Sequence, residues 1–208
     1  MKDGLALIDF GAGNLHSVEN ALRAAGAGRI IVTCDPNDVL RAERVVLPGV
    51  GAFGSCASAL RAIPGMVEAM EERVLRGGAP FLGICVGMQL LATRGIEFGT
   101  HDGLDWIPGE VRAIEVTDPA IKVPHMGWND VRPMPHHDGA GLIEQGEAYF
   151  LHSFHYVTES GRDIAAITDH GGAITAVARD NLLGVQFHPE KSQRYGIDLL
   201  ERFLDWTP

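Results

Sequence analysis

The sequence is poor in cysteine, poor in positive charge and free of long hydrophobic runs. Its 208 residues include three cysteines, Cys34, Cys56 and Cys85. This odd, low number provides no disulfide framework and suits a reducing cytoplasm, where we expect the protein to act. No run approaches the roughly 20 apolar residues that span a bilayer, and the N-terminus turns acidic too soon for a signal peptide. We therefore expect neither a secreted disulfide scaffold nor a membrane protein.

Positive charge is outweighed by negative charge. The chain has 17 Lys and Arg against 27 Asp and Glu, which gives a formal net charge of −10. A nucleic-acid binder normally carries a basic surface, so we expect no nucleic-acid partner, although a local basic patch is compatible with this charge. Hydrophobic residues make up 46% of the chain, enough for a full core. The length and the absence of linkers or repeats favour one domain over residues 1–208.

The first half of the chain alternates between strand-like and helical patterns. The expected strands cover residues 5–10, 29–33, 45–47 and 81–84. The expected helices cover about residues 15–25, 55–63 and 66–76, and residues 38–44 are expected to form a short helix or a turn. This alternation predicts an α/β fold with a mostly parallel sheet and helices on both faces. Ligands of such folds bind at the carboxyl ends of the strands, where the turn Gly11–Gly13, the loop Pro48–Gly51 and Cys85 are expected.

The second half is dominated by strand patterns. The expected strands cover residues 111–116, 122–129, 148–157, 164–169, 173–179 and 182–188, followed by a helix at about 195–206. His170-Gly171-Gly172 is a hairpin turn signal between two of these strands. We therefore expect an antiparallel region attached to the parallel sheet.

Cys85 lies where an apolar strand meets a run of helix formers. Gly83 and Gly87 flank it two residues away on either side. A side chain at a tight strand-to-helix turn needs small neighbours because the backbone passes close to itself there. The following helix would direct free N–H groups and its positive end at the sulfur, which favours the reactive thiolate. A catalytic nucleophile and a small buried packing residue both fit this pattern.

A thiol nucleophile needs a base, and His188-Pro189-Glu190 is the candidate. Residues two apart in an extended segment point to the same side, so Glu190 can hold one imidazole nitrogen while the other meets the thiol. A surface histidine and glutamate at a strand end would also fit. The N–H of Val86 and the loop around Val50 and Gly51 are candidate oxyanion donors.

Substrate contacts and metal sites have weaker signals. Gln89 lies on the helix face of Cys85, and Gly49 precedes the mobile Val50 peptide, so both are candidate substrate contacts. Gly11-Ala12-Gly13 lacks the third glycine of a dinucleotide fingerprint. His136-His137-Asp138 lacks a second ligand pair, which favours a polar loop over a metal site. We expect no cofactor and no metal.

Seven motifs together carry a family resemblance. Gly83–Gln89 and Val185–Glu190 resemble the two hallmarks of class I, triad-type glutamine amidotransferases. The other motifs look like the glutaminase subunits of imidazole glycerol phosphate synthase: Asp9–Leu15, Pro48–Phe53, Pro124–Asn129, Tyr149–Ser153 and Lys191-Ser192. The resemblance covers essentially the whole chain. It implies a flavodoxin-like class I glutamine amidotransferase fold. Phe10 and Val86, where the family often has tyrosine and leucine, preserve bulk.

The resemblance also implies a reaction and a partner. Cys85 would attack L-glutamine, with His188 as proton relay and Glu190 orienting it, through a glutamyl thioester. Ammonia would pass to a cyclase with a (β/α)₈ barrel that makes imidazole glycerol phosphate and AICAR in histidine biosynthesis. Lys191 would lie at the subunit interface near the ammonia exit, and Trp128 and His125 would be interface or hinge residues. The alternatives are a glutaminase of another synthase, such as pyridoxal phosphate synthase, and a non-catalytic binding or stress protein on the same fold.

Overall fold

The parallel half of the main sheet is built by the apolar strands of the first half of the chain. A computed structural model describes residues 4–115, 121–135 and 141–208. Within these ranges a nine-stranded sheet has the order β2-β1-β3-β4-β13-β12-β11-β8-β9. Its parallel strands are β1 (Leu5–Ile8), β2 (Ile30–Thr33), β3 (Arg44–Gly49), β4 (Phe81–Cys85) and β13 (Leu182–Val185). The predicted parallel pairing is confirmed for the four strands of the first half, whereas β13 comes from the region expected to be antiparallel and is parallel to β4.

The other half of the sheet is antiparallel. It consists of β12 (Ile174–Arg179), β11 (Ile164–Ile167), β8 (His125–Pro133) and β9 (Gly146–His152). β11 and β12 pair across the predicted turn at 170–172. β13 joins the two halves, because it is antiparallel to β12 and parallel to β4. This position brings the segment that follows β13 next to Cys85 at the end of β4.

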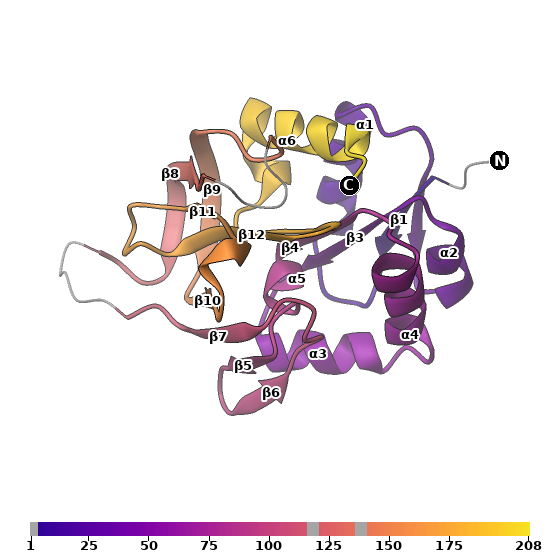
Figure 1. Ribbon diagram of the computed structural model, residues 1–208, viewed down its shortest axis with the longest axis horizontal. Helices are drawn as coiled ribbons and strands as arrows, with labels where there is room; N and C mark the ends of the chain where they lie inside the picture. The colour runs from indigo at the N-terminus through magenta and orange to yellow at the C-terminus, as the bar shows by residue number, and fades with distance from the viewer. Residues whose placement is uncertain (1–3, 116–120, 136–140) are drawn as a thin grey trace.

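Helices cover both faces of the parallel strands, as predicted. Figure 1 shows α1 (Leu15–Ala24) and α6 (Gln193–Asp205) on one side, and α3 (Phe53–Arg61) and α4 (Met66–Met70) on the other. α2 (Pro36–Arg41) packs near α4, which continues as the π-helix η1 (Glu71–Arg76). Each long helix buries one apolar stripe; in α1 the stripe is Val18, Ala21 and Leu22.

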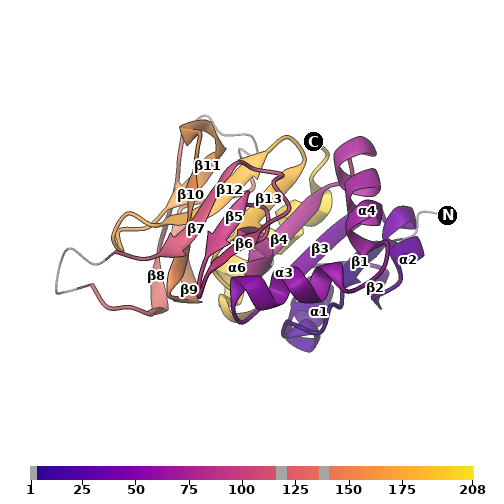
Figure 2. The ribbon, with the colours of Figure 1, turned by 90° about the horizontal axis from the view of Figure 1, so that it is seen from below.

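A second, four-stranded sheet was not expected. It has the order β10-β7-β5-β6, with β10 (Phe154–Thr158), β7 (Gly109–Ala113), β5 (Arg94–Ile96) and β6 (Thr100–Asp102). Figure 2 shows this sheet near α3, which its strand β6 contacts. The prediction of one strand over residues 148–157 is wrong. The segment breaks at Ser153 because β9 pairs with β8, whereas β10 pairs with β7 in the other sheet.

Three short helical turns complete the described structure. They are α5 (Val86–Gln89), η2 (Gly161–Asp163) and η3 (Pro189–Lys191). α5 is a single turn, so the helix expected from Val86 is shorter than its composition suggests. In the described ranges, we find no helix with the length and apolarity needed to cross a membrane.

Candidate active site

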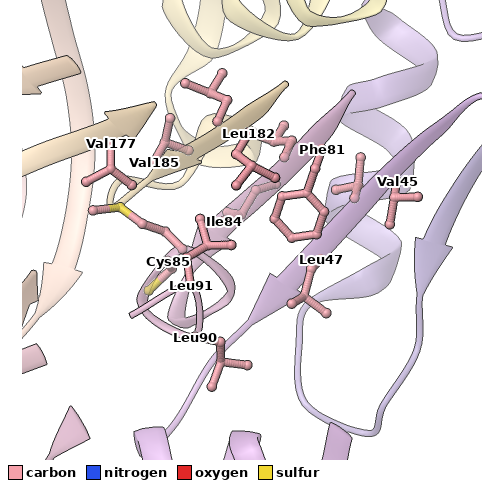
Figure 3. Close-up of a cluster of buried hydrophobic side chains, with 14 of the residues drawn as sticks. Val45, Leu47, Phe81, Ile84, Cys85, Leu90, Leu91, Val177, Leu182 and Val185 are labelled. Carbon is pink, nitrogen blue, oxygen red and sulfur yellow. The ribbon is translucent and has the colours of Figure 1, made fainter. Parts of the chain in front are cut away.

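Cys85 occupies a strained turn between β4 and α5. Its φ of 54° and ψ of −112° lie outside the regions that non-glycine residues favour. The flanking glycines are required by packing. A Cβ on Gly87 would lie 1.9 Å from the Leu47 carbonyl oxygen, and one on Gly83 would lie 2.6 Å from the Gly87 oxygen. Figure 3 shows Cys85 at the end of β4, among apolar side chains of neighbouring strands.

His188 and Glu190 form a buried pair on the segment after β13. His188 Nδ1 lies 2.8 Å from Glu190 Oε1. Their backbone is fixed on both sides: the His188 N–H donates to the Tyr149 carbonyl at 3.0 Å, and the Ser192 hydroxyl donates to the His188 carbonyl at 2.7 Å. The structure thus places the two residues on one side of their segment, as the spacing of two predicts.

The electrostatic surroundings of His188 favour its protonated form. Burial alone would lower the pKa of this imidazole. Side-chain hydrogen bonds with Cys85 and Glu190 outweigh that effect and raise the pKa to about 10. A protonated imidazole beside Cys85 is the arrangement that a thiolate nucleophile requires.

A cavity of about 170 Å³ opens onto the sulfur. Its lining consists of Val50, Gly51, Cys85, Val86, Gln89, Glu97, Leu151, His152, Ser153, Phe154, His188 and Lys191. The structure therefore brings the candidate nucleophile, base, oxyanion donors and substrate contact Gln89 into one pocket. Gly49 lies behind this wall, opposite Cys85 in the β3–β4 register. A Cβ on Gly49 would come within 2.8 Å of the Gly87 nitrogen.

The amide nitrogen of Gln89 is engaged within the protein. It donates to Gln186 Oε1 at 2.9 Å and to the Phe154 carbonyl at 3.2 Å. These contacts use both of its protons, so Gln89 Oε1 is the atom that can accept a hydrogen bond from a ligand.

Comparison with known proteins identifies the family. A family model described as glutamine amidotransferase class-I matches residues 6–206. The chain is 59% identical to imidazole glycerol phosphate synthase subunit HisH of Zymomonas mobilis, over 98% of this chain and 96% of that protein. It is 52% identical to the HisH subunit of Caulobacter vibrioides, over 98% and 99%. The chain belongs to the HisH family of class-I glutamine amidotransferases.

Solved structures support the family fold. The structure of PurLQS from Thermotoga maritima superposes with a TM-score of 0.72 at 18% identity, covering 99% of both chains. A crystal structure described as glutamine amidotransferase gives a TM-score of 0.74 at 17% identity, covering 97% of this chain and 98% of that one. The expected class I glutamine amidotransferase fold is therefore confirmed.

The three predicted interface residues of this HisH-family chain occupy different environments. Trp128 is half exposed and packs edge-on against Tyr149, at 6.2 Å between ring centroids. Lys191 lines the pocket, with Nζ 5.8 Å from the centre of the same Tyr149 ring. His125 is buried and stacks between Phe150 and His170. Direct contact of His125 with another subunit would require exposing a side chain that this chain buries.

Sequence reasoning missed Glu97 and His152 as pocket residues. Glu97 Oε2 accepts a hydrogen bond from the Phe53 N–H at 2.7 Å, which fixes the carboxylate at the start of α3. His152 joins His125 through a 2.9 Å contact between ring nitrogens. Burial is the main reason that the pKa of His152 falls to about 4 and that of His125 to about 3, so both rings are neutral. His152 lies within the Tyr149–Ser153 motif, but that motif assigned it no place in the pocket, and Glu97 lies outside every motif named above.

No group of three or more His, Cys, Asp or Glu side chains in the described ranges could hold a metal ion. His136, His137 and Asp138 lie outside the described residues.

Proposed function

We propose that this chain is the glutaminase subunit of an imidazole glycerol phosphate synthase. In this proposal it hydrolyses L-glutamine and delivers ammonia to a (β/α)₈-barrel cyclase, which makes imidazole glycerol phosphate and AICAR in histidine biosynthesis. The observation that carries the proposal is the buried His188–Glu190 pair beside Cys85 in the pocket of a HisH-family chain. We also propose that residues 1–208 form one domain that acts in the cytoplasm without a cofactor; the family match over residues 6–206 and three free cysteines support this.

The first half-reaction transfers the glutamyl group to sulfur. The Cys85 thiolate attacks the side-chain amide carbon of glutamine, and the carbon–oxygen π electrons move onto the oxygen. Protonated His188 gives its proton to the amide nitrogen. When the tetrahedral intermediate collapses, the C–N bond breaks, ammonia leaves and a thioester remains. Glu190 orients the imidazole and stabilises its positive charge throughout.

The pocket offers partners for the oxyanion, the α-ammonium group and the side-chain amide of the substrate. The Val86 N–H lies in the first turn of α5 and has no partner within that helix, so it is a donor for the oxyanion. The peptides of Val50 and Gly51, which follow β3 beside the Cys85 turn, supply the second donor. Glu97 pairs with the α-ammonium group of glutamine, and Gln89 Oε1 accepts from its side-chain amide.

The second half-reaction releases glutamate. Neutral His188 takes a proton from water, which attacks the thioester carbon. Collapse of this second intermediate expels the Cys85 thiolate and restores the starting ion pair. Ammonia leaves the pocket past Lys191, toward the cyclase, which binds on the side of the molecule where Trp128 is exposed.

The test is Cys85→Ala, assayed as the complex with the cyclase. Glutamate release should be abolished, because Cys85 supplies the only thiol in the pocket lining described above, while cyclisation driven by added ammonia should continue. Cys34→Ala is the matched control, since Cys34 is an exposed thiol outside the pocket and should keep full activity. Loss of both activities in Cys85→Ala would contradict separate glutaminase and synthase roles. A wild-type complex that releases no glutamate would favour the non-catalytic alternative.

A further inference from the structure

Gln186 is a buried polar residue that the mechanism above does not use. It follows β13 directly and precedes His188 by two residues, with 0% of its surface exposed. Its backbone N–H donates to the Thr175 carbonyl at 2.8 Å, which fixes the start of the side chain. Its Nε2 lies 3.6 Å from Cys85 Sγ. A buried primary amide is costly unless both of its ends are satisfied, so these contacts set its orientation.

A chain of hydrogen bonds determines which end of the Gln186 amide faces the sulfur. The Phe154 carbonyl can only accept, so the group of Gln89 that contacts it is the NH₂ group. The same nitrogen donates to Gln186, whose contacting atom is therefore the oxygen. The opposite end of the Gln186 amide is then the NH₂ group, and it points at Cys85.

Two histidines fix the Phe154 carbonyl at the start of this series of hydrogen bonds. His152 Nδ1 lies 2.8 Å from the Phe154 carbonyl oxygen, which can only accept, so Nδ1 carries the proton. His152 Nε2 must then accept from His125 Nδ1, and His125 Nε2 accepts from the Asn129 amide at 3.2 Å. From Asn129 to the Phe154 carbonyl, each group therefore donates to the next one in the series. On the other side of that carbonyl, Gln89 donates to it and to Gln186, and Gln186 donates to the sulfur.

We propose that Gln186 is a further catalytic residue of the glutaminase proposed above, whose side-chain amide donates a hydrogen bond to Cys85 Sγ and stabilises the thiolate. A thiolate accepts hydrogen bonds better than a thiol, so a fixed N–H donor favours the charged form. The donor acts twice, on the thiolate that attacks glutamine and on the thiolate that leaves when the thioester is hydrolysed. His188 and Gln186 thus hold the sulfur by two independent contacts.

The test measures the thiolate directly in the isolated full chain. Alkylation of Cys85 by iodoacetamide is followed from pH 5 to pH 10 by peptide mass spectrometry, which separates it from Cys34 and Cys56. In Gln186→Met, which keeps length but lacks a donor, the midpoint should rise by about one pH unit, a tenfold loss of thiolate below the midpoint. Gln186→Glu keeps the oxygen that Gln89 requires and should shift the midpoint in the same direction.

The control is Thr175→Val, an isosteric change at the adjacent buried position of β12. Thr175 Oγ1 has no hydrogen-bond partner in the described structure, so the midpoint should stay at the wild-type value. The titratable groups that contact Cys85 or share its pocket are retained in all variants: His188, Lys191, Glu97, His152 and Cys56. Gln186→Glu adds a carboxyl group, so Gln186→Met is the variant that isolates the loss of the donor. A folded Gln186 variant with the wild-type midpoint overturns the proposal.

A measurement on the wild-type chain covers the case in which neither variant folds. The side-chain amide proton signals of Gln186 should shift with the same midpoint as the alkylation rate and should lose this dependence in Cys85→Ala. Signals that do not titrate with Cys85 overturn the proposal.

In complex with the cyclase, the folded Gln186 variants should lose kcat for glutamine hydrolysis about tenfold near pH 6, with little change in KM. A wild-type complex without glutaminase activity would instead reject the proposed function, whatever the alkylation midpoints show.

Discussion

At the scale of single residues, the charge on His188 depends on Glu190. The carboxylate lies in a buried contact with Nδ1, and together with Cys85 it keeps the imidazole protonated. Glu190→Gln keeps the shape and removes the charge, so the pKa of His188 should fall toward its usual value. Because general acid–base catalysis contributes about 10² to 10⁴ in rate, we expect kcat for glutamine hydrolysis to fall by about 10² or more. Glutamate release by the cyclase complex, together with an NMR titration of His188, measures both effects.

The same substitution should also change how the free energy of unfolding depends on pH. The folded-state pKa of His188, about 10, lies above the unfolded value of about 6.5. Protonation of His188 therefore stabilises the fold fully below about pH 6.5, and this contribution is lost as the pH rises through about 10. The free energy of unfolding should differ between wild type and Glu190→Gln most at pH 6 and least at pH 10, as measured with urea. Glu72→Gln, in an exposed ion pair with Arg76, is the control. A difference that grows with pH would contradict the assignment.

The residues of the site differ in how far the sequence could predict them. His188 and Glu190 are two residues apart in an extended segment, so their pairing is a local property of the chain. Gln186 and Gln89 are 97 positions apart, and Glu97 and Phe53 are 44 apart. These contacts exist because β13 inserts beside β4 and the β5–β6 hairpin folds back on α3. No spacing rule connects such residues before the topology is known.

At the scale of elements, the junction of β3, β4 and α5 depends on the absence of a side chain at Gly87. A Cβ there would lie 1.9 Å from the Leu47 carbonyl oxygen, which is backbone inside a central strand and cannot move aside cheaply. Gly87→Ala should therefore destabilise the fold by about 2 kcal/mol or more, in the range of strained or overpacked core positions. Thermal unfolding measures the loss. Gly28→Ala is the control, because its Cβ would meet nothing within 4 Å. Equal unfolding temperatures for the two variants would contradict this account.

The strands could be predicted where one stretch of strand-like sequence forms one strand of one sheet. The first four strands of the parallel core are short apolar runs next to turns and helical patterns, and their length and flanking residues identified them. The run from 148 to 157 kept a strand pattern throughout, yet it serves two sheets, with His125 opposite His152 in one and Ala113 opposite Phe154 in the other. Local sequence sets the strand conformation, whereas the change of pairing partner at Ser153 is decided by distant strands.

At the scale of the whole molecule, one face near the pocket has an excess of exposed apolar side chains. Met126 is 67% exposed, Trp128 47% and Leu151 40%, on the adjacent strands β8 and β9. Leu151 also lines the pocket, so this face adjoins the site. Exposed apolar groups around a functional pocket are typical of a surface that another protein covers. We expect the cyclase to cover this face, which would place its ammonia entrance next to Lys191.

Trp128 is the side chain on this face best suited to anchor the partner. Its ring is held against Tyr149, so little conformational freedom is lost on binding, and tryptophan is enriched among residues whose truncation costs about 2 kcal/mol or more. Trp128→Ala should raise the Kd for the cyclase by about 30-fold, since 1.4 kcal/mol corresponds to a factor of ten. Calorimetric titration of the purified subunits measures the affinity, and an unchanged circular dichroism spectrum shows that the fold is kept. Leu75→Ala is the control, because Leu75 is 46% exposed on η1, which leads into the opposite end of β4 from Cys85. If both variants bind as tightly as wild type, the cyclase docks elsewhere, and ammonia must leave the pocket by a route that does not pass the Trp128 face.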